Sequence, residues 1–136
     1  TVEFSGSSGK GAHPIVVSYG SSPPAEVIYA NPPATTAPTA VAALTCFAQI
    51  EYAGVLRGSE HVEEAKLLID YLTDVTFQES LPLSQFVYPV NGAAKLPQEF
   101  LDYAVKPENP LRMAPDAIAK NRTRWLDEWK QIVVDS

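Results

Sequence analysis

A shortage of strand-forming segments limits what this chain can fold into more than any other feature. Residues 14–19 contain the continuous β-branched run Ile15-Val16-Val17, and residues 45–53 alternate imperfectly between apolar and polar side chains. These are the two clear strand patterns, and a two-stranded sheet is marginally stable in water. We therefore expect both strands to pair with a part of the protein outside this sequence.

Helical patterns account for most of the remaining chain. The clearest lies at 60–72, and the longest begins at Pro115 and runs to about residue 134. Shorter helices are predicted at 24–29, at 76–80 and within 96–103, and an extended loop at 82–91. Residues 1–13 contain a Gly/Ser-rich run and are predicted to be flexible, whereas residues 14–136 form the structured portion. Several helices with few short strands predict an α/β protein.

Composition and charge exclude several classes of function. The 136 residues are 46% apolar, carry a net charge of −6, and have ten scattered Lys and Arg, which argues against a nucleic-acid partner. Cys46 is alone, and His13 and His61 lack the spacing of metal ligands. No nucleophile elbow, phosphate-binding loop or dinucleotide fingerprint occurs. The sequence therefore predicts no catalytic residue, no metal site and no cofactor.

The segment at 18–23 has the pattern of a strand end, a turn and a helix start. Gly20 breaks the strand after Tyr19, and Ser22 suits a helix N-cap with Pro23 at the first helical position. Ser21, Ser22 and the first helical amides could hold an anionic group such as a phosphate, with the Tyr19 ring free to stack beside it. Ordinary helix capping with a core tyrosine explains the same residues and stays open.

The extended loop at 82–91 brings two aromatic rings close together in the sequence. Phe86 and Tyr88 are two residues apart, so alternation places them on the same face of an extended segment, and Pro89 keeps Tyr88 extended. Such a loop can present a ring to a ligand. A loop fixed by buried aromatic side chains has the same pattern.

Three short motifs occur in a fixed order along the chain. They are the Ser-Tyr-Gly-Ser-Ser-Pro run at 18–23, the Phe-Val-Tyr-Pro-Val run at 86–90, and Trp125, Glu128 and Trp129 in the last helix. Together they resemble the C-terminal part of the solute-binding proteins of bacterial thiamine-type ABC importers, from about residue 15 to about residue 134. The resemblance implies the C-terminal portion of a two-lobe class II periplasmic-binding-protein fold, an α/β fold with short strands and several helices.

The resemblance also implies where a ligand binds. In that family the ligand lies between two lobes, and its ring stacks on aromatic side chains at the positions of Tyr19 and Phe86. Phe86 replaces a Trp of the well-known thiamine binders, and Ala25 replaces a second tyrosine that lines their site. Thiamine or a similar small molecule is the implied ligand, bound by Ser18, Tyr19, Gly20, Ser21, Ser22, Phe86 and Tyr88.

The function implied by the resemblance is that of the extracytoplasmic solute-binding component of an ABC importer. Such a protein releases its solute unchanged and is not an enzyme. The implied partners are the small solute, an ABC permease in the membrane and the N-terminal lobe of the same protein. The implied location is the periplasm or the cell exterior, associated with the membrane through the transporter, and this chain starts without a signal peptide.

Two alternatives stay open. One is a stand-alone interaction or assembly module, in which exposed strand edges pair with a second copy to form a homodimer. The other is a solute-binding protein for another solute such as iron, although the chain lacks the adjacent tyrosine pair typical of ferric-ion binders. A gene position beside those of a permease and an ATPase would favour import over the assembly module.

Overall fold

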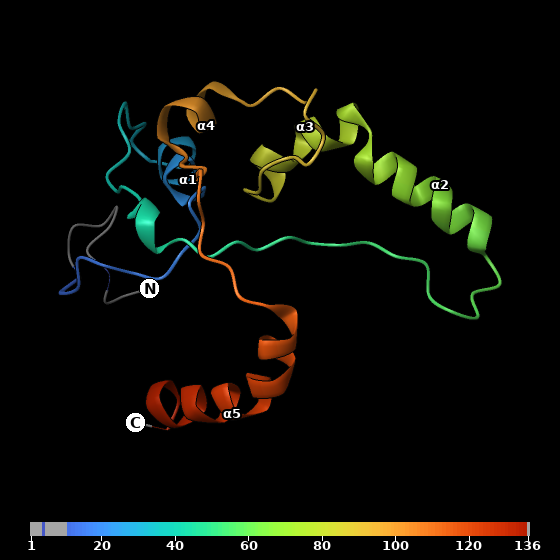
Figure 1. The fold of residues 1–136 in the computed structure, drawn as a ribbon. Helices are drawn as coiled ribbons and strands as arrows, with labels where there is room; N and C mark the ends of the chain where they lie inside the picture. The colour runs from blue at the N-terminus through green and yellow to red at the C-terminus, as the bar shows by residue number, and fades with distance from the viewer. Residues whose placement is uncertain (1–3, 5–10, 136) are drawn as a thin grey trace.

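The computed structural model of the chain describes Phe4 and residues 11–135. These residues are mainly helical, and the β-pairings among them are two isolated bridges (Figure 1). The helices are α1 (Ser22–Ile28), the 3₁₀ helix η1 (Ala43–Thr45), α2 (Val62–Thr73), α3 (Val75–Ser84), α4 (Gln98–Tyr103) and α5 (Pro115–Val133).

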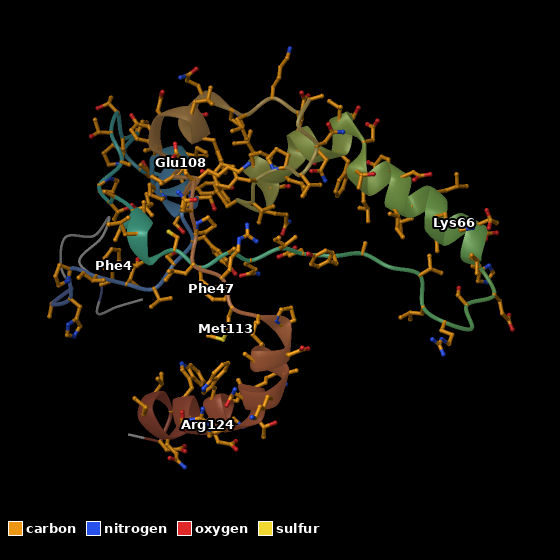
Figure 2. The ribbon with its side chains drawn as sticks, in the orientation of Figure 1. Phe4, Phe47, Lys66, Glu108, Met113 and Arg124 are labelled. Carbon is orange, nitrogen blue, oxygen red and sulfur yellow. The ribbon has the colours of Figure 1, made fainter. Side chains whose placement is uncertain are left out.

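The helices pack as two pairs. Helix α1 lies against α4 and α2 lies against α3, while α5 stands apart from both pairs (Figure 1). A long extended segment leads from η1 to α2. It passes Phe47, which bridges to Leu111 on the segment that continues through Met113 into α5 (Figure 2). The Phe47–Leu111 bridge is held by the amide of Ala48 on the Leu111 carbonyl at 2.8 Å.

The most buried side chains lie on α1, α3 and α4. Phe100 of α4 is 2% exposed, and Pro24 and Pro82 are also fully buried. Proline side chains pack well but lack a backbone donor, so these positions bury apolar surface without adding an unpaired N–H group. The packed centre of the described residues therefore lies beside the N-terminus of α1 and the C-terminus of α3.

The two predicted strands are not formed. Residues 14–19 have no regular structure, and Ile15 is 85% and Val17 100% exposed. Residues 45–53 start in the last residue of η1 and then make a single bridge through Phe47. A strand needs a neighbour for its backbone N–H and C=O groups, and among the described residues these segments find almost none. A mainly helical chain with few strand residues is compatible with part of an α/β protein, and the two-lobe architecture stays a prediction.

The helix predictions are confirmed for the strongly periodic segments. The helix predicted at 60–72 is α2, the helical turn within 96–103 is α4, and the final helix from Pro115 is α5. Helix α1 begins at Ser22, one residue before the predicted first helical position Pro23, because Ser21 takes the N-cap position predicted for Ser22. The division of the chain at residue 13 stays a prediction, and most of the segment predicted to be flexible lies outside the described residues.

Helix α3 is longer than the sequence predicted. It covers Val75–Ser84, so the loop predicted from residue 82 begins only at Gln85. Pro82 removes one backbone donor in the last turn, but the Gln85 amide still reaches the Leu81 carbonyl at 2.8 Å. A proline near a helix end therefore costs one hydrogen bond here without ending the helix.

Helix α5 carries an exposed charge pair. Arg124 and Glu128 are 2.7 Å apart on an exposed face, and such pairs contribute only a few tenths of a kcal/mol. Its apolar face is largely uncovered, with Trp129 54% and Ile132 71% exposed. No helix among the described residues has the length and apolar character needed to cross a membrane.

Asp74 separates α2 from α3 and offers a local test of this fold. Its backbone leaves the helical region (φ −67°, ψ 148°), and its carboxylate accepts the Thr76 amide at 2.8 Å as the N-cap of α3. Hydrogen bonds from Thr76 lower the pKa of the Asp74 carboxyl below its usual value of about 4. The carboxylate therefore stabilises the fold above that usual value, and this contribution is lost as the pH falls through the lowered pKa.

We expect Asp74→Ala to lower the urea midpoint of unfolding at neutral pH, because the first amides of α3 lose their acceptor. Asp74→Asn is the matched control, since it keeps a side-chain oxygen at the N-cap without a titrating group. The Asn variant should keep most of the neutral-pH stability and lose only the part of the pH dependence below about 4 that Asp74 contributes. Equal losses in both variants at neutral pH would contradict the capping role.

Candidate ligand-binding site

The turn at residues 18–22 is held by hydrogen bonding to the segment that follows α4. The Val105 amide donates to the Gly20 carbonyl at 2.8 Å, and the Ser22 amide donates to the Tyr19 carbonyl at 3.0 Å. A Cβ atom on Gly20 would lie 2.5 Å from the Val105 carbonyl oxygen, closer than real Cβ contacts. Glycine is therefore required at position 20 by close backbone approach.

The serines of this turn bond to protein partners. Ser21 is 4% exposed, and its hydroxyl donates to the backbone carbonyl of Phe86. The hydroxyls of Ser18 and Ser22 lie 2.6 Å apart. No side chain caps α1, which is only seven residues long. The predicted anion site at this helix start therefore stays a prediction, and its serine hydroxyls already have partners within the chain.

Phe86 holds an unusual backbone conformation directly after α3. Its φ is 54°, in the left-handed region that helices commonly enter just past their C-cap, usually with glycine. For an aromatic residue this conformation costs about 1–2 kcal/mol. Its ring stacks on Phe100 at a centroid distance of 6.3 Å and meets Tyr29 edge-on at 5.8 Å. Aromatic contacts of this kind contribute about 0.5–1.5 kcal/mol each, which offsets the backbone cost.

Tyr88 also contacts the ring of Phe100. Its centroid is 5.9 Å from that of Phe100 in an edge-on arrangement, and the Lys106 ammonium lies 5.8 Å from the Tyr88 ring centroid. Burial, and to a smaller extent the electrostatic effect of nearby Cys46, raise the pKa of the Tyr88 hydroxyl above its usual value. Tyr88 is therefore a neutral, half-buried ring at physiological pH.

The loop that follows Tyr88 is anchored by two amide side chains. Gln78 is 5% exposed, donates to the Leu72 carbonyl at 2.6 Å and accepts the Val90 amide at 2.7 Å. Asn91 donates to the Thr73 carbonyl at 2.9 Å. Both contacts fasten the loop to the junction of α2 and α3, so the loop that carries Phe86 and Tyr88 has a fixed path.

The predicted site residues are brought together. The turn at 18–22 meets the aromatic loop through Ser21 and Phe86, and both predicted loop rings contact Phe100, although Phe86 is left-handed and not extended as predicted. Tyr19 is 61% exposed, so its ring is accessible, as expected for a stacking residue. Whether these side chains touch a ligand stays a prediction.

Sequence reasoning missed three residues that shape the site: Tyr29, Phe100 and Lys106. Phe100 lies on a helix of six residues, too short for apolar periodicity to show its buried face. Tyr29 gave a usable signal, since it is one helical turn beyond Ala25, on the same side of α1 as the position where the family has its second tyrosine. No signal in the sequence pointed to Lys106.

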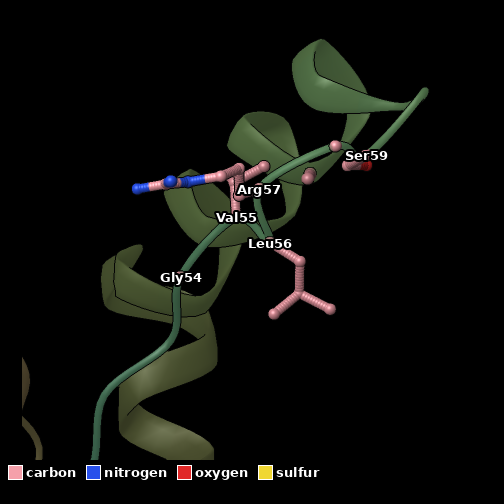
Figure 3. A pocket seen from close by; sticks show the side chains of 7 residues that line it. Gly54, Val55, Leu56, Arg57 and Ser59 are labelled. Atoms are coloured by element: carbon pink, nitrogen blue, oxygen red, sulfur yellow. The ribbon is translucent and has the colours of Figure 1, made fainter.

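Two hollows lie outside the predicted site residues. One of about 450 Å³ lies between the turn at 54–59 and Ala65 of α2, with Leu56 and Arg57 at its edge (Figure 3). The other, of about 470 Å³, is lined partly by Glu26 and Tyr29. No group of three His, Cys, Asp or Glu side chains within Phe4 and 11–135 is arranged to hold a metal ion.

The predicted resemblance is confirmed by comparison with known proteins. The chain is similar to the thiamine-binding periplasmic protein of Salmonella typhimurium, with 31% identity over 87 residues, 64% of this chain and 26% of that protein. It is similar to the protein of the same name from Brucella suis, with 32% identity over 122 residues, 88% of this chain and 35% of that protein. The Brucella abortus protein is 33% identical over 84 residues, 61% of this chain and 25% of its own length.

The similarity covers much of this chain but little of its relatives. The chain spans about a quarter to a third of the length of the curated proteins it matches. No family model matches the chain, and no solved structure matches it. The similarity therefore supports a thiamine-type solute-binding protein, as the motifs at 18–23 and 86–90 predicted.

The close approach at Gly20 generates a direct test of the site's geometry. We expect Gly20→Ala to lower the free energy of unfolding by about 1–3 kcal/mol, because the new methyl group must displace the Val105 carbonyl. Gly54→Ala is the matched control, since a Cβ there meets nothing within 4 Å. Urea denaturation of the three proteins measures the difference. A Gly20→Ala variant as stable as Gly54→Ala would show that the turn does not lie against Val105.

Proposed function

We propose that this chain is the C-terminal portion of the solute-binding component of an ABC importer. It would form one wall of a cleft between two lobes of a class II periplasmic binding fold, and the cleft would bind thiamine or a similar small molecule. The N-terminal lobe of the same protein would supply the opposite wall, and an ABC permease would receive the solute. The relatives are named as thiamine-binding proteins of the periplasm, and these names support both the proposed function and a periplasmic location.

One observation carries the proposal: Ser21 joins the turn that bears Tyr19 to the loop that bears Phe86. Two segments 65 residues apart thus meet at a point where the Tyr19 ring is exposed and the Phe86 ring is half-buried. Thiamine contains a planar, cationic ring, and the faces of Tyr and Phe attract such cations by about 0.5–2 kcal/mol. The net charge of −6 favours the approach of a cation as well.

The assembly module has its own supporting observation. Ile15, Val17, Tyr52 and Trp129 are more than half exposed, and a partner that covered these separate segments would bury apolar surface that the described chain leaves in water. Under this alternative the chain would form a homodimer without binding a solute. Light scattering across a hundredfold range of protein concentration, with and without thiamine, separates the two functions. Binding by a protein of constant mass supports import, and concentration-dependent mass without binding supports assembly.

The ring of Phe86 provides the sharpest test of the import function. In the full-length protein that contains this chain, we expect Phe86→Ala to weaken thiamine binding by roughly 1–3 kcal/mol, the scale of losing a stacked, buried ring. Phe86→Trp should keep or strengthen binding, because Trp offers a larger face to a cation. Isothermal calorimetry measures the dissociation constants, and thermal unfolding measures stability on the same samples.

Phe77→Ala is the matched control for this experiment. Phe77 lies on α3, before the loop that carries Phe86, and packs on the ring of Tyr71 at a centroid distance of 5.3 Å. The Phe77→Ala substitution should lower thermal stability and leave the affinity of the folded protein for thiamine unchanged. If Phe86→Ala behaves in the same way, Phe86 is a packing residue and the proposed stacking site is wrong.

A further inference from the structure

We propose that Ser21 is a positioning residue that sets the direction of the Phe86 ring and does not itself bind the ligand. The proposal rests on the function proposed above, and it changes the role that the sequence predicted for Ser21. Ser21 is 4% exposed, and its hydroxyl donates to the Phe86 carbonyl. A buried hydroxyl already used in this way has little surface left for a solute.

The backbone of Phe86 needs such a fixed partner. Its φ of 54° is unfavourable for a residue with a side chain, and rotation to negative φ would relieve the strain and swing the ring to a new direction. The bond from Ser21 ends on the carbonyl of Phe86 itself, and rotation about φ would move this carbonyl together with the ring, so the bond opposes that rotation. Losing this bond frees the peptide that holds the strained conformation.

Ser21 can act as a fixed point because its own turn is rigid. The Gly20 carbonyl is bonded to the Val105 amide at 2.8 Å, and the approach of the two chains leaves no room for a side chain at position 20. The backbone next to Ser21 is therefore held by the segment after α4, and this contact does not depend on the loop to which the Ser21 hydroxyl bonds. Groups that must present a ring to a ligand gain affinity from this kind of preorganisation.

The ring contacts of Phe86 do not replace this restraint. Phe100 and Tyr29 touch the ring at centroid distances of 6.3 Å and 5.8 Å, and such contacts tolerate a range of tilts. A hydrogen bond to the carbonyl is directional and acts on the backbone. Ser21 thus decides the backbone state, while the two neighbouring rings stabilise the side chain in that state.

The first part of the test needs no ligand. The full-length protein is labelled with fluorophenylalanine, and the ¹⁹F resonance of Phe86 is assigned by its loss in Phe86→Leu. We expect Ser21→Ala to shift or broaden that resonance. Ser22→Ala is the matched control, because among the described residues the Ser22 hydroxyl bonds to the Ser18 hydroxyl and not to the loop that carries Phe86. Its Phe86 resonance should stay in place.

The second part is a double-mutant cycle on thiamine affinity. Ser21→Ala should weaken binding about fivefold, the scale of one hydrogen bond, when Phe86 is present. In the Phe86→Ala background it should cause no further loss, because the ring through which Ser21 acts is gone. Ser21→Cys has a similar size and a weaker donor, and it should give an intermediate resonance and affinity even if the alanine variant folds poorly.

Each result decides the role of Ser21. An unchanged Phe86 resonance in both Ser21→Ala and Ser21→Cys would overturn the proposal. Equal losses of affinity with and without the Phe86 ring would make Ser21 a direct ligand contact and would also overturn it. If the wild-type protein binds no thiamine, the proposed function fails, but the ligand-free resonance still shows whether Ser21 holds Phe86.

Discussion

The ring of Phe100 is the contact on which both parts of the candidate site depend. It stacks on Phe86, meets the edge of Tyr88, and belongs to a helix that packs on α1, next to the turn that carries Tyr19. Fully burying a Phe side chain stabilises a protein by about 1.5–3 kcal/mol. In a chain that leaves many large apolar side chains exposed, this single ring fixes the position of the aromatic loop relative to the turn.

Local patterns predicted the helices well and the strands poorly, for a physical reason. The spacing of apolar residues in α2 and α5 repeats over three or more turns within the segment itself, so their bounds were predicted to within about two residues. A strand is stabilised by a neighbour that its own sequence does not contain. The run at Ile15-Val16-Val17 has the right residues, but the described chain offers it no partner strand.

The sequence predicted which residues form the candidate site, but it did not predict how those residues contact one another. Two short motifs selected Tyr19 and Phe86, and the structure brings their segments together. The left-handed backbone of Phe86 could not be predicted, because this conformation normally indicates glycine or asparagine. The bond from Ser21 joins residues 65 positions apart, a distance over which spacing carries no information. Non-local contacts of this kind decide which side chains face a ligand.

The contacts that shape the candidate site lie entirely within this chain. The Gly20–Val105 and Ser21–Phe86 bonds and the stack on Phe100 need no second lobe to form. The uncovered apolar face around Trp129 does need a partner surface, since its burial yields about 25 cal/mol per Å². Under the proposed function, this chain supplies a preformed wall of the cleft with fixed rings. Closure of the other lobe then adds the remaining ligand contacts. Because the wall is ordered before the solute arrives, closure spends little of its binding energy on ordering Phe86.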